Sequence, residues 1–231
     1  MQVWVVGGTQ GIGAAWVQHL REQGHTVWTG ARHPESSQSI AIDLSDPDSI
    51  QSAVAMAIGA LPDLQMVINT AGVLHWESGQ PEKSLRQLQS DAALYSYQVN
   101  ALGPALLAQQ LWDCMRKTKG FRFASLSARV GSISDNRLGG WHSYRASKAA
   151  QNMLLKNVAL ELKRVNPSAV VALLHPGTVD TQLSKPFQSR VPSDKLFDAA
   201  RAAEQLNRVL MDFESEDSGV LRDWAGQDIP F

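Results

Sequence analysis

Residues 3 to 13 read VWVVGGTQGIG, and this stretch decides the fold. Four apolar residues run directly into a glycine-rich turn, and residues 12 to 23 then carry apolar side chains at helical spacing. A buried strand that turns tightly into an amphipathic helix is typical of the first half of a βαβ unit. The start of the chain therefore predicts an α/β protein.

The rest of the chain repeats this alternation. Short apolar runs bounded by turn residues predict buried parallel strands, and helical patterns lie between them. The expected strands are residues 3–7, 25–31, 64–69, 121–127 and 170–177, and the expected helices are residues 12–23, 49–59, 91–117, 145–165 and 194–213. This order predicts a doubly wound Rossmann fold, with a mostly parallel sheet flanked by helices. Because the composition does not shift along the chain, we expect residues 1–231 to form a single domain.

Local signals support two of the helix boundaries. Ser45 and Asp48 have the spacing of a capping box before the helix at 49–59. Gly24 follows the first expected helix, where a glycine commonly ends one.

The composition narrows the range of partners. The 231 residues carry a formal net charge of −1, which gives no reason to expect nucleic acid or a membrane as a partner. Cys114 is the only cysteine, so an intramolecular disulfide and a thiolate zinc cluster are ruled out. The six histidines lack ligand spacing, and we predict no metal site. Because the chain has neither a leader-like start nor a long apolar run, we expect a cytoplasmic protein.

The glycine-rich turn suits a phosphate group. A side chain at Gly7, Gly11 or Gly13 would block the tight turn, keep the backbone away from a pyrophosphate or hold the helix off the strand. The start of a helix also offers free backbone N–H groups and the positive end of its dipole. We therefore expect a dinucleotide here; the alternative is a tight turn that binds nothing.

The end of the second expected strand bears on which dinucleotide binds. A carboxylate there would accept a hydrogen bond from the ribose 2′-hydroxyl of NAD(H), but the sequence VWTGARH at 27–33 has none. Arg32 stands there instead, and a guanidinium suits the 2′-phosphate of NADP(H) in charge and geometry. NADP(H) is therefore favoured over NAD(H), with an ordinary exposed arginine as the alternative.

Five motifs, in order, resemble those of the short-chain dehydrogenase/reductase family. They are Gly-x3-Gly-x-Gly at 7–13, NTAG at 69–72, Asn100 in a long helix, YRASK at 144–148 and HPG at 175–177. The run SARVGSISDNRLGGWHSYRASKAA at 127–150 and the ending WAGQDIPF at 224–231 are most similar to the branch of small carbonyl reductases and C-factor-like proteins. The resemblance covers essentially the whole chain.

This resemblance implies which residues contact the cofactor. Asp43 and Leu44 would lie near the adenine, and Val179 and Thr181, with Thr178, near the nicotinamide carboxamide. The remaining implied contacts are Ile12, Asn69, Ala71, Gly72, Pro176 and Gly177. Most of these residues follow expected strands, at the edge where a doubly wound sheet opens its ligand crevice.

The motif YRASK supplies the expected chemistry. A carbonyl that accepts hydride develops negative charge on oxygen and needs a proton donor. Tyr144 and Lys148 are four residues apart and share a helix face, so the ammonium is expected to favour the phenolate and lower the Tyr144 pKa. Lys148 could also hold the nicotinamide ribose. Taken alone, such a pair is more often an ordinary surface pair; the glycine turn and the strand order favour catalysis.

Two further catalytic residues are implied by the family. Asn100 would hold a water in the proton relay behind Lys148, or it marks a polar kink beside Gly103 and Pro104. The position at which the family usually has its carbonyl-binding serine is Ala128 in this chain.

The serine could instead come from a neighbouring position. Ser127 lies one residue earlier and is the predicted donor to the substrate carbonyl. Ser132, and an arrangement in which no serine acts, remain alternatives.

The sequence thus predicts an NADP(H)-dependent oxidoreductase that acts on a small-molecule carbonyl or alcohol, with Tyr144 as general acid and base. The alternative is an NAD(P)-binding signalling or regulatory protein of C-factor type with little turnover, which Ala128 supports. The family also implies a homodimer or homotetramer formed through the helices that contain Asn100 and Tyr144.

Three aromatic residues are expected near the substrate. Trp141, His142 and Phe187 would favour an apolar or aromatic carbonyl compound, although Trp141 could equally pack against a neighbouring loop.

Overall fold

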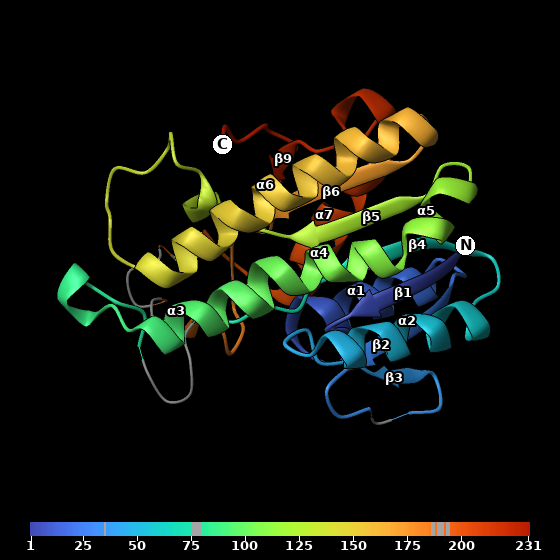
Figure 1. The fold of residues 1–231 in the computed structure, drawn as a ribbon, viewed down its shortest axis with the longest axis horizontal. Helices are drawn as coiled ribbons and strands as arrows, with labels where there is room; N and C mark the ends of the chain where they lie inside the picture. The colour runs from blue at the N-terminus through green and yellow to red at the C-terminus, as the bar shows by residue number, and fades with distance from the viewer. Residues whose placement is uncertain (35, 75–79, 186–187, 189–191, 193–194) are drawn as a thin grey trace.

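Within the part of the chain that the structure describes, one parallel sheet of seven strands forms the centre of the protein (Figure 1). The structure, a computed structural model, describes residues 1–34, 36–74, 80–185, 188, 192 and 195–231. In spatial order the strands are β3 (Ser39–Ala41), β2 (Thr26–Ala31), β1 (Gln2–Val6), β4 (Leu64–Asn69), β5 (Arg122–Leu126), β6 (Val170–His175) and β9 (Leu221–Asp223). The predicted Rossmann fold is confirmed. The strand order reverses between β1 and β4, which is where such a sheet opens its ligand crevice.

Helices cover both faces of the sheet. Figure 1 shows α2 (Pro47–Ala60), α4 (Gly103–Gln110) and α6 (His142–Val165) on the near face, and α1 (Gly11–Glu22) and α7 (Ala199–Met211) on the far face. Each face has its own buried apolar cluster, one shared with α2, α4 and α6 and the other with α1 and α7. Among the described residues, none of the helices has both the length and the apolar surface needed to cross a bilayer.

Strand β1 shows why this sequence forms a central strand. Val3 and Val5 point into the cluster beneath α1 and α7, while Trp4 and Val6 point into the opposite cluster. All four side chains are almost completely buried. Burying side chains of this size contributes about 1.5–3 kcal/mol each. The run of apolar residues without alternation therefore fits a strand covered on both faces.

The long helix expected at residues 91–117 is divided. It consists of α3 (Ser90–Tyr97), a π-helical turn η2 (Gln98–Leu102), α4 and α5 (Trp112–Lys117). Gly103 begins α4 close to the chain after β3, because a Cβ atom there would lie 2.5 Å from the Leu44 carbonyl oxygen. The division places Asn100 in the π-helical turn, a feature that often marks functional sites.

Other predicted boundaries need correction. The capping box at Ser45 is wrong: Asp46 caps α2 by accepting from the Asp48 backbone N–H, and Ser45 hydrogen-bonds to Asp43. Helix α7 begins at residue 199 rather than 194, because Asp198 caps it. The short strands β3, β7 (Thr178–Val179), β8 (Leu196–Phe197) and β9 were not among the five expected, since two or three residues carry no readable periodicity. Short 3-10 turns lie at η1 (Leu85–Gln87), η3 (Arg129–Gly131) and η6 (Ser215–Asp217).

Candidate active site

The turn between β1 and α1 is so tight that it requires glycine at two positions. Gly7 has a φ of +80°, a conformation that strains other residues, and a Cβ atom on it would lie 2.7 Å from the Ala71 backbone nitrogen. A Cβ atom on Gly13 would collide with the Gly7 carbonyl oxygen. Helix α1 begins at Gly11, and the side chain of Gln10 does not cap it. Its first N–H groups can therefore bind an anion.

The segment after β6 forms the opposite wall of this turn. A Cβ atom on Gly11 would lie 3.2 Å from Thr181 Cγ2, so the two segments face each other closely. Val179 is buried, and Ile12 packs against the apolar cluster that contains it. The other predicted residues of this wall directly follow β6: Pro176, Gly177 and Thr178.

The end of β4 is fixed by a buried amide. Asn69 is fully buried, and its Oδ1 accepts a hydrogen bond from the Ala71 backbone N–H at 3.2 Å. Its Nδ2 donates to Ser125 Oγ on β5 at 3.0 Å. The predicted cofactor residues of this turn therefore have a rigid backbone held from the neighbouring strand.

Asn100 clamps the loop that follows. Its Oδ1 accepts from the Val73 N–H at 2.8 Å, and its Nδ2 donates to the Val73 carbonyl at 2.7 Å and to Ser147 Oγ at 3.1 Å. A Cβ atom on Gly72 would lie 3.1 Å from Asn100 Oδ1 and 3.6 Å from Lys148 Nζ. Asn100 therefore lies beside the predicted catalytic lysine, and its water-holding role stays a prediction.

The residues predicted at the adenine end lie near one another. Arg32 is exposed and has no hydrogen bond or ion pair to another residue in the described ranges. Partial burial opposes ionisation of Asp43, but hydrogen bonds from Ser45 and the charge of Arg32 lower its pKa. Leu44 is buried against Gly103. Within the described ranges, an unpaired guanidinium therefore lies at the end of β2, as an anion site requires.

Tyr144 and Lys148 share the first turns of α6, as the spacing predicts. Lys148 Nζ lies 5.8 Å from the centre of the Tyr144 ring. Burial lowers the pKa of Lys148 to about 7 and raises the pKa of Tyr144. The expected lowering of the tyrosine pKa is therefore wrong for this arrangement, because the cost of burying charge outweighs the attraction between ammonium and phenolate.

Apolar side chains surround the Tyr144 ring. Leu74 and Ala128 pack in one buried cluster with it, and Val130 and Trp141 border that cluster. The rings of Trp141 and Tyr144 meet edge to face with centroids 6.3 Å apart. His142 begins α6, and Phe187 lies outside the described residues.

The predicted serine is turned away from a donor role. Ser127 is buried, and its hydroxyl donates to Asn152 Oδ1 on α6 at 2.6 Å. The methyl group of Ala128 packs in the Tyr144 cluster, at the position where the family resemblance led us to expect a hydroxyl. To donate to a substrate, Ser127 must first release Asn152.

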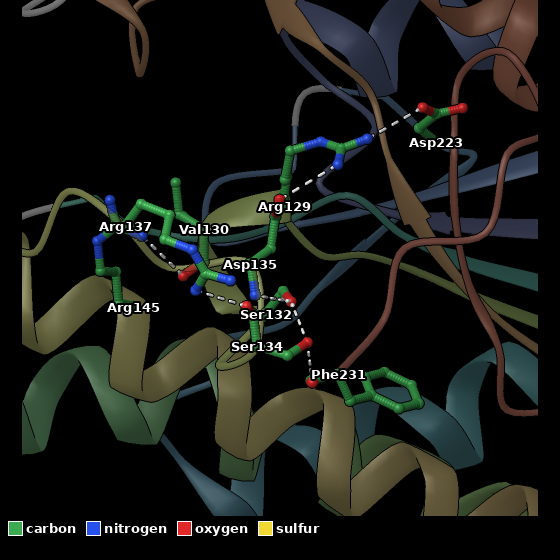
Figure 2. Close-up of polar contacts among 9 residues, drawn as sticks. All are labelled: Arg129, Val130, Ser132, Ser134, Asp135, Arg137, Arg145, Asp223 and Phe231. Atoms are coloured by element: carbon green, nitrogen blue, oxygen red, sulfur yellow. Dashed lines mark hydrogen bonds and ion pairs between the residues drawn. The ribbon is translucent and has the colours of Figure 1, made fainter.

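Ser132, the alternative donor, is buried and belongs to a hydrogen-bond network of the loop before α6 (Figure 2). Its Oγ accepts from the Asp135 backbone N–H at 3.1 Å. Ser134 beside it donates to the Phe231 carbonyl at 2.7 Å, and Arg129 joins Asp135 to Asp223. The hydroxyl of Ser132 therefore accepts a hydrogen bond within the loop that leads into α6.

Sequence reasoning missed one buried polar residue. Gln151 is fully buried, and its Oε1 accepts a hydrogen bond from Lys148 Nζ at 2.9 Å. Positions 144, 148 and 151 lie on one helix face, so a glutamine three residues after the lysine was a readable signal.

The chain is similar to several known proteins. The family profile described as short chain dehydrogenase matches residues 1–192. The chain is 29% identical over 192 residues to 1-hydroxy-2-glutathionyl-2-methyl-3-butene dehydrogenase of Rhodococcus sp. (strain AD45), covering 80% of each protein. It is 31% identical over 136 residues to C-signal of Myxococcus xanthus, covering 59% of this chain and 76% of that protein.

Solved structures show the same fold. The NADPH-bound carbonyl reductase from chicken fatty liver superposes with a TM-score of 0.86 at 24% identity, covering 100% of this chain and 98% of that one. Carbonyl reductase Sniffer of D. melanogaster gives 0.85 at 21% identity, covering 100% and 99%. The resemblance to the family and the similarity to C-signal are confirmed, and the fold is shared with these carbonyl reductases. The chain belongs to the short-chain dehydrogenase family.

Proposed function

We propose that the protein is an NADP(H)-dependent oxidoreductase that transfers hydride between the nicotinamide and a carbonyl or alcohol substrate. The observation that carries the proposal is the position of Tyr144. Tyr144 lies in an apolar cluster beside Lys148, close to residues 69–72. Those residues contact the glycine turn after β1. When bound, NADP(H) supplies or accepts the hydride.

Tyr144 acts as the general acid in the reductive direction. Negative charge develops on the carbonyl oxygen as the bond to carbon forms, and the phenol donates its proton there. Burial raises the pKa of Tyr144, so the phenol remains protonated at neutral pH. The site is therefore better suited to reduce a carbonyl than to oxidise an alcohol near pH 7.

The cofactor residues divide by the group they hold. The turn at Gly7, Gly11 and Gly13 takes the pyrophosphate, and Arg32 takes the 2′-phosphate by charge. Lys148 takes the nicotinamide ribose. Asp43 and Leu44 take the adenine, and the wall that contains Val179 and Thr181 takes the carboxamide.

Ser127 is the proposed donor to the substrate carbonyl. Asn152 Nδ2 is buried without a hydrogen-bond partner among the described residues. If the Asn152 amide reverses, Nδ2 donates to Ser127 Oγ and the serine proton becomes free for the substrate. Asn100 holds the water of the proton relay in this scheme.

The substrate is an apolar or aromatic carbonyl compound. Leu74, Val130 and Trp141 border the Tyr144 ring and offer little to a charged group. Apolar walls with one convergent polar group are typical of small-molecule sites.

A second function has two observations in its favour. Ala128 replaces the family's hydroxyl beside Tyr144, and the chain is similar to C-signal. On this alternative, the protein binds NAD(P) and has little turnover.

The proposed assembly is a homodimer or homotetramer. Large apolar side chains on α3 and α6 stay exposed: Leu94, Tyr97, Met153 and Leu160. A second copy of the chain that packs on these side chains would remove their apolar surface from water, which favours association.

The direct test is NADPH oxidation against a panel of aldehydes, ketones and diones. Wild type should reduce at least one apolar member, and Tyr144→Phe should lose about 100-fold or more in kcat, as removal of a general acid does. NADPH binding should survive in the variant, measured by fluorescence titration. Binding without turnover in wild type would favour the regulatory alternative, and equal rates in wild type and variant would exclude Tyr144 as the acid.

A further inference from the structure

A chain of buried polar side chains runs from the end of β4 to the catalytic helix. Asn69 Nδ2 donates to Ser125 Oγ at 3.0 Å, and Gln151 Nε2 donates to the same oxygen at 2.7 Å. Gln151 Oε1 then accepts from Lys148 Nζ at 2.9 Å. Asn69, Ser125 and Gln151 have no exposed surface, and Lys148 has 3%. Such a chain is costly to bury unless every member is satisfied.

Among the residues that the structure describes, two acceptors engage two of the three ammonium protons of Lys148. One goes to Gln151 Oε1 and the other to the Leu126 carbonyl oxygen, each at 2.9 Å. Among the described residues, the titratable group beside the ammonium is Tyr144 on α6, whose ring centre lies 5.8 Å away. The side chains that β4, β5 and η2 bring near it are the neutral Asn69, Ser125 and Asn100. No carboxylate within the described ranges forms an ion pair with Lys148.

The orientation of the Gln151 amide is fixed by its neighbours. Its Nε2 donates to Ser125 Oγ and, at 3.3 Å, to the Leu126 carbonyl, so its oxygen faces Lys148. The reverse orientation would place an NH2 group against the ammonium, which has no acceptor to offer.

We infer that Gln151 is a positioning residue for the proposed reaction: it anchors the Lys148 ammonium to β4 and β5 and leaves the third N–H for the Tyr144 side of the site. The inference rests on the proposed function, in which Lys148 holds the ribose beside the general acid. Because a hydrogen bond to a charged form favours that form, Gln151 also opposes the effect of burial, which lowers the pKa of Lys148 to about 7.

Three variants test this role. Gln151→Leu removes the acceptor at nearly constant size, and Gln151→Glu keeps an acceptor oxygen toward the lysine. Asn166→Leu is the matched control, because Asn166 is another buried amide, and its Nδ2 donates to the Met115 and Thr118 carbonyls at the far end of α6. The Lys148 pKa of all three variants is measured by NMR titration of protein labelled with 13C at lysine Cε. The Lys148 signal is assigned by its loss in Lys148→Met.

The same variants are assayed with NADPH and the best carbonyl of the panel. Gln151→Leu should lower the Lys148 pKa by about one unit and reduce kcat/KM for NADPH about tenfold at pH 7. Gln151→Glu should raise that pKa and recover most of the rate, while Asn166→Leu should change neither.

The outcomes separate this inference from the proposed function. An unchanged Lys148 pKa and rate in Gln151→Leu, or an equal effect of Asn166→Leu, overturns the role of Gln151 and leaves the reductase proposal intact. If wild type reduces no carbonyl but Gln151→Leu still lowers the lysine pKa, the reductase proposal fails and the anchoring of Lys148 stands.

Discussion

Tyr144 and Lys148 are both removed from water, and both are thereby pushed toward their neutral forms. Burial raises the pKa of the phenol and lowers that of the ammonium to about 7. A phenol that keeps its proton is a competent acid for a carbonyl that receives hydride. The Gln151 side-chain oxygen and the Leu126 carbonyl oxygen accept hydrogen bonds from the lysine, in place of a carboxylate partner.

The proposed hydrogen bond to the substrate carbonyl depends on the Ser127 hydroxyl. If Ser127 supplies the carbonyl donor, Ser127→Ala should lower kcat about 100-fold, the usual loss when one oxyanion donor is removed. Ser132→Ala is the matched control and should leave kcat unchanged, because Ser132 serves the loop. Stopped-flow NADPH oxidation measures both. No loss in either variant would leave Tyr144 alone on the carbonyl.

The expected preference for NADP(H) over NAD(H) depends on the Arg32 side chain. The Arg32 guanidinium is exposed and unpaired within the described ranges, so its charge is available to a 2′-phosphate. Arg32→Asp should weaken NADPH binding about tenfold to 100-fold and improve NADH binding, as a carboxylate repels the phosphate. Fluorescence titration with both cofactors measures this. Tighter binding of NADH than NADPH by wild type would contradict the preference.

At the scale of elements, the start of α6 depends on a residue 61 positions away. Trp141 occupies the N-cap position with a positive φ and offers no side-chain cap. The buried Glu82 carboxylate instead accepts from the Ser143 backbone N–H and hydroxyl. The segment that contains Glu82 thereby fixes the first turn of the helix that carries Tyr144.

Glu82→Ala should therefore affect stability and rate together. Loss of a helix cap costs about 1 kcal/mol of the free energy of unfolding, and a loosened first turn should lower kcat for carbonyl reduction. Urea unfolding and the NADPH assay measure the two effects. Glu161→Ala, on the exposed side of the same helix, is the control and should change neither. Unchanged stability in Glu82→Ala would show that the cap is not needed.

Local patterns in the sequence were enough for the glycine turn, the five long strands and the Tyr144–Lys148 pair, because each depends on neighbours a few residues apart. The place of Gln151 on the same helix face as Lys148 was also readable, but the distant partners of the buried side chains were not. Gln151 meets Ser125 across 26 residues and Ser127 meets Asn152 across 25, so these bonds exist only once the sheet has formed. The π-helical turn at Asn100 was also hidden, because its sequence continues an ordinary helical pattern.

For the whole molecule, the reversal of strand order between β1 and β4 gathers the site at one edge of the sheet. The glycine turn, the Asn69 turn and the wall after β6 come from distant parts of the chain and meet there. The apolar clusters on both faces of the sheet stabilise the fold, and this offsets the free-energy cost of burying Lys148.

Burial of Lys148 predicts how stability depends on pH. Between pH 7 and about 10 the unfolded chain binds the lysine proton and the folded protein does not, so the free energy of unfolding should rise with pH through this window. From pH 7 to 9 wild type should gain about 2 kcal/mol relative to Lys148→Met, a variant without that proton. Urea titrations at the two pH values measure the difference. Parallel behaviour of the two proteins would contradict a lysine pKa near 7.

The central claim is that hydride passes to a carbonyl carbon while Tyr144 protonates the oxygen. The most direct test uses NADPH that carries deuterium at the transferable position of nicotinamide C4, with the best carbonyl of the panel, and mass spectrometry of the alcohol. The account predicts one deuterium on the carbinol carbon of the wild-type product and almost no alcohol from Tyr144→Phe. Alcohol without deuterium, or equal labelled alcohol from both proteins, would contradict it.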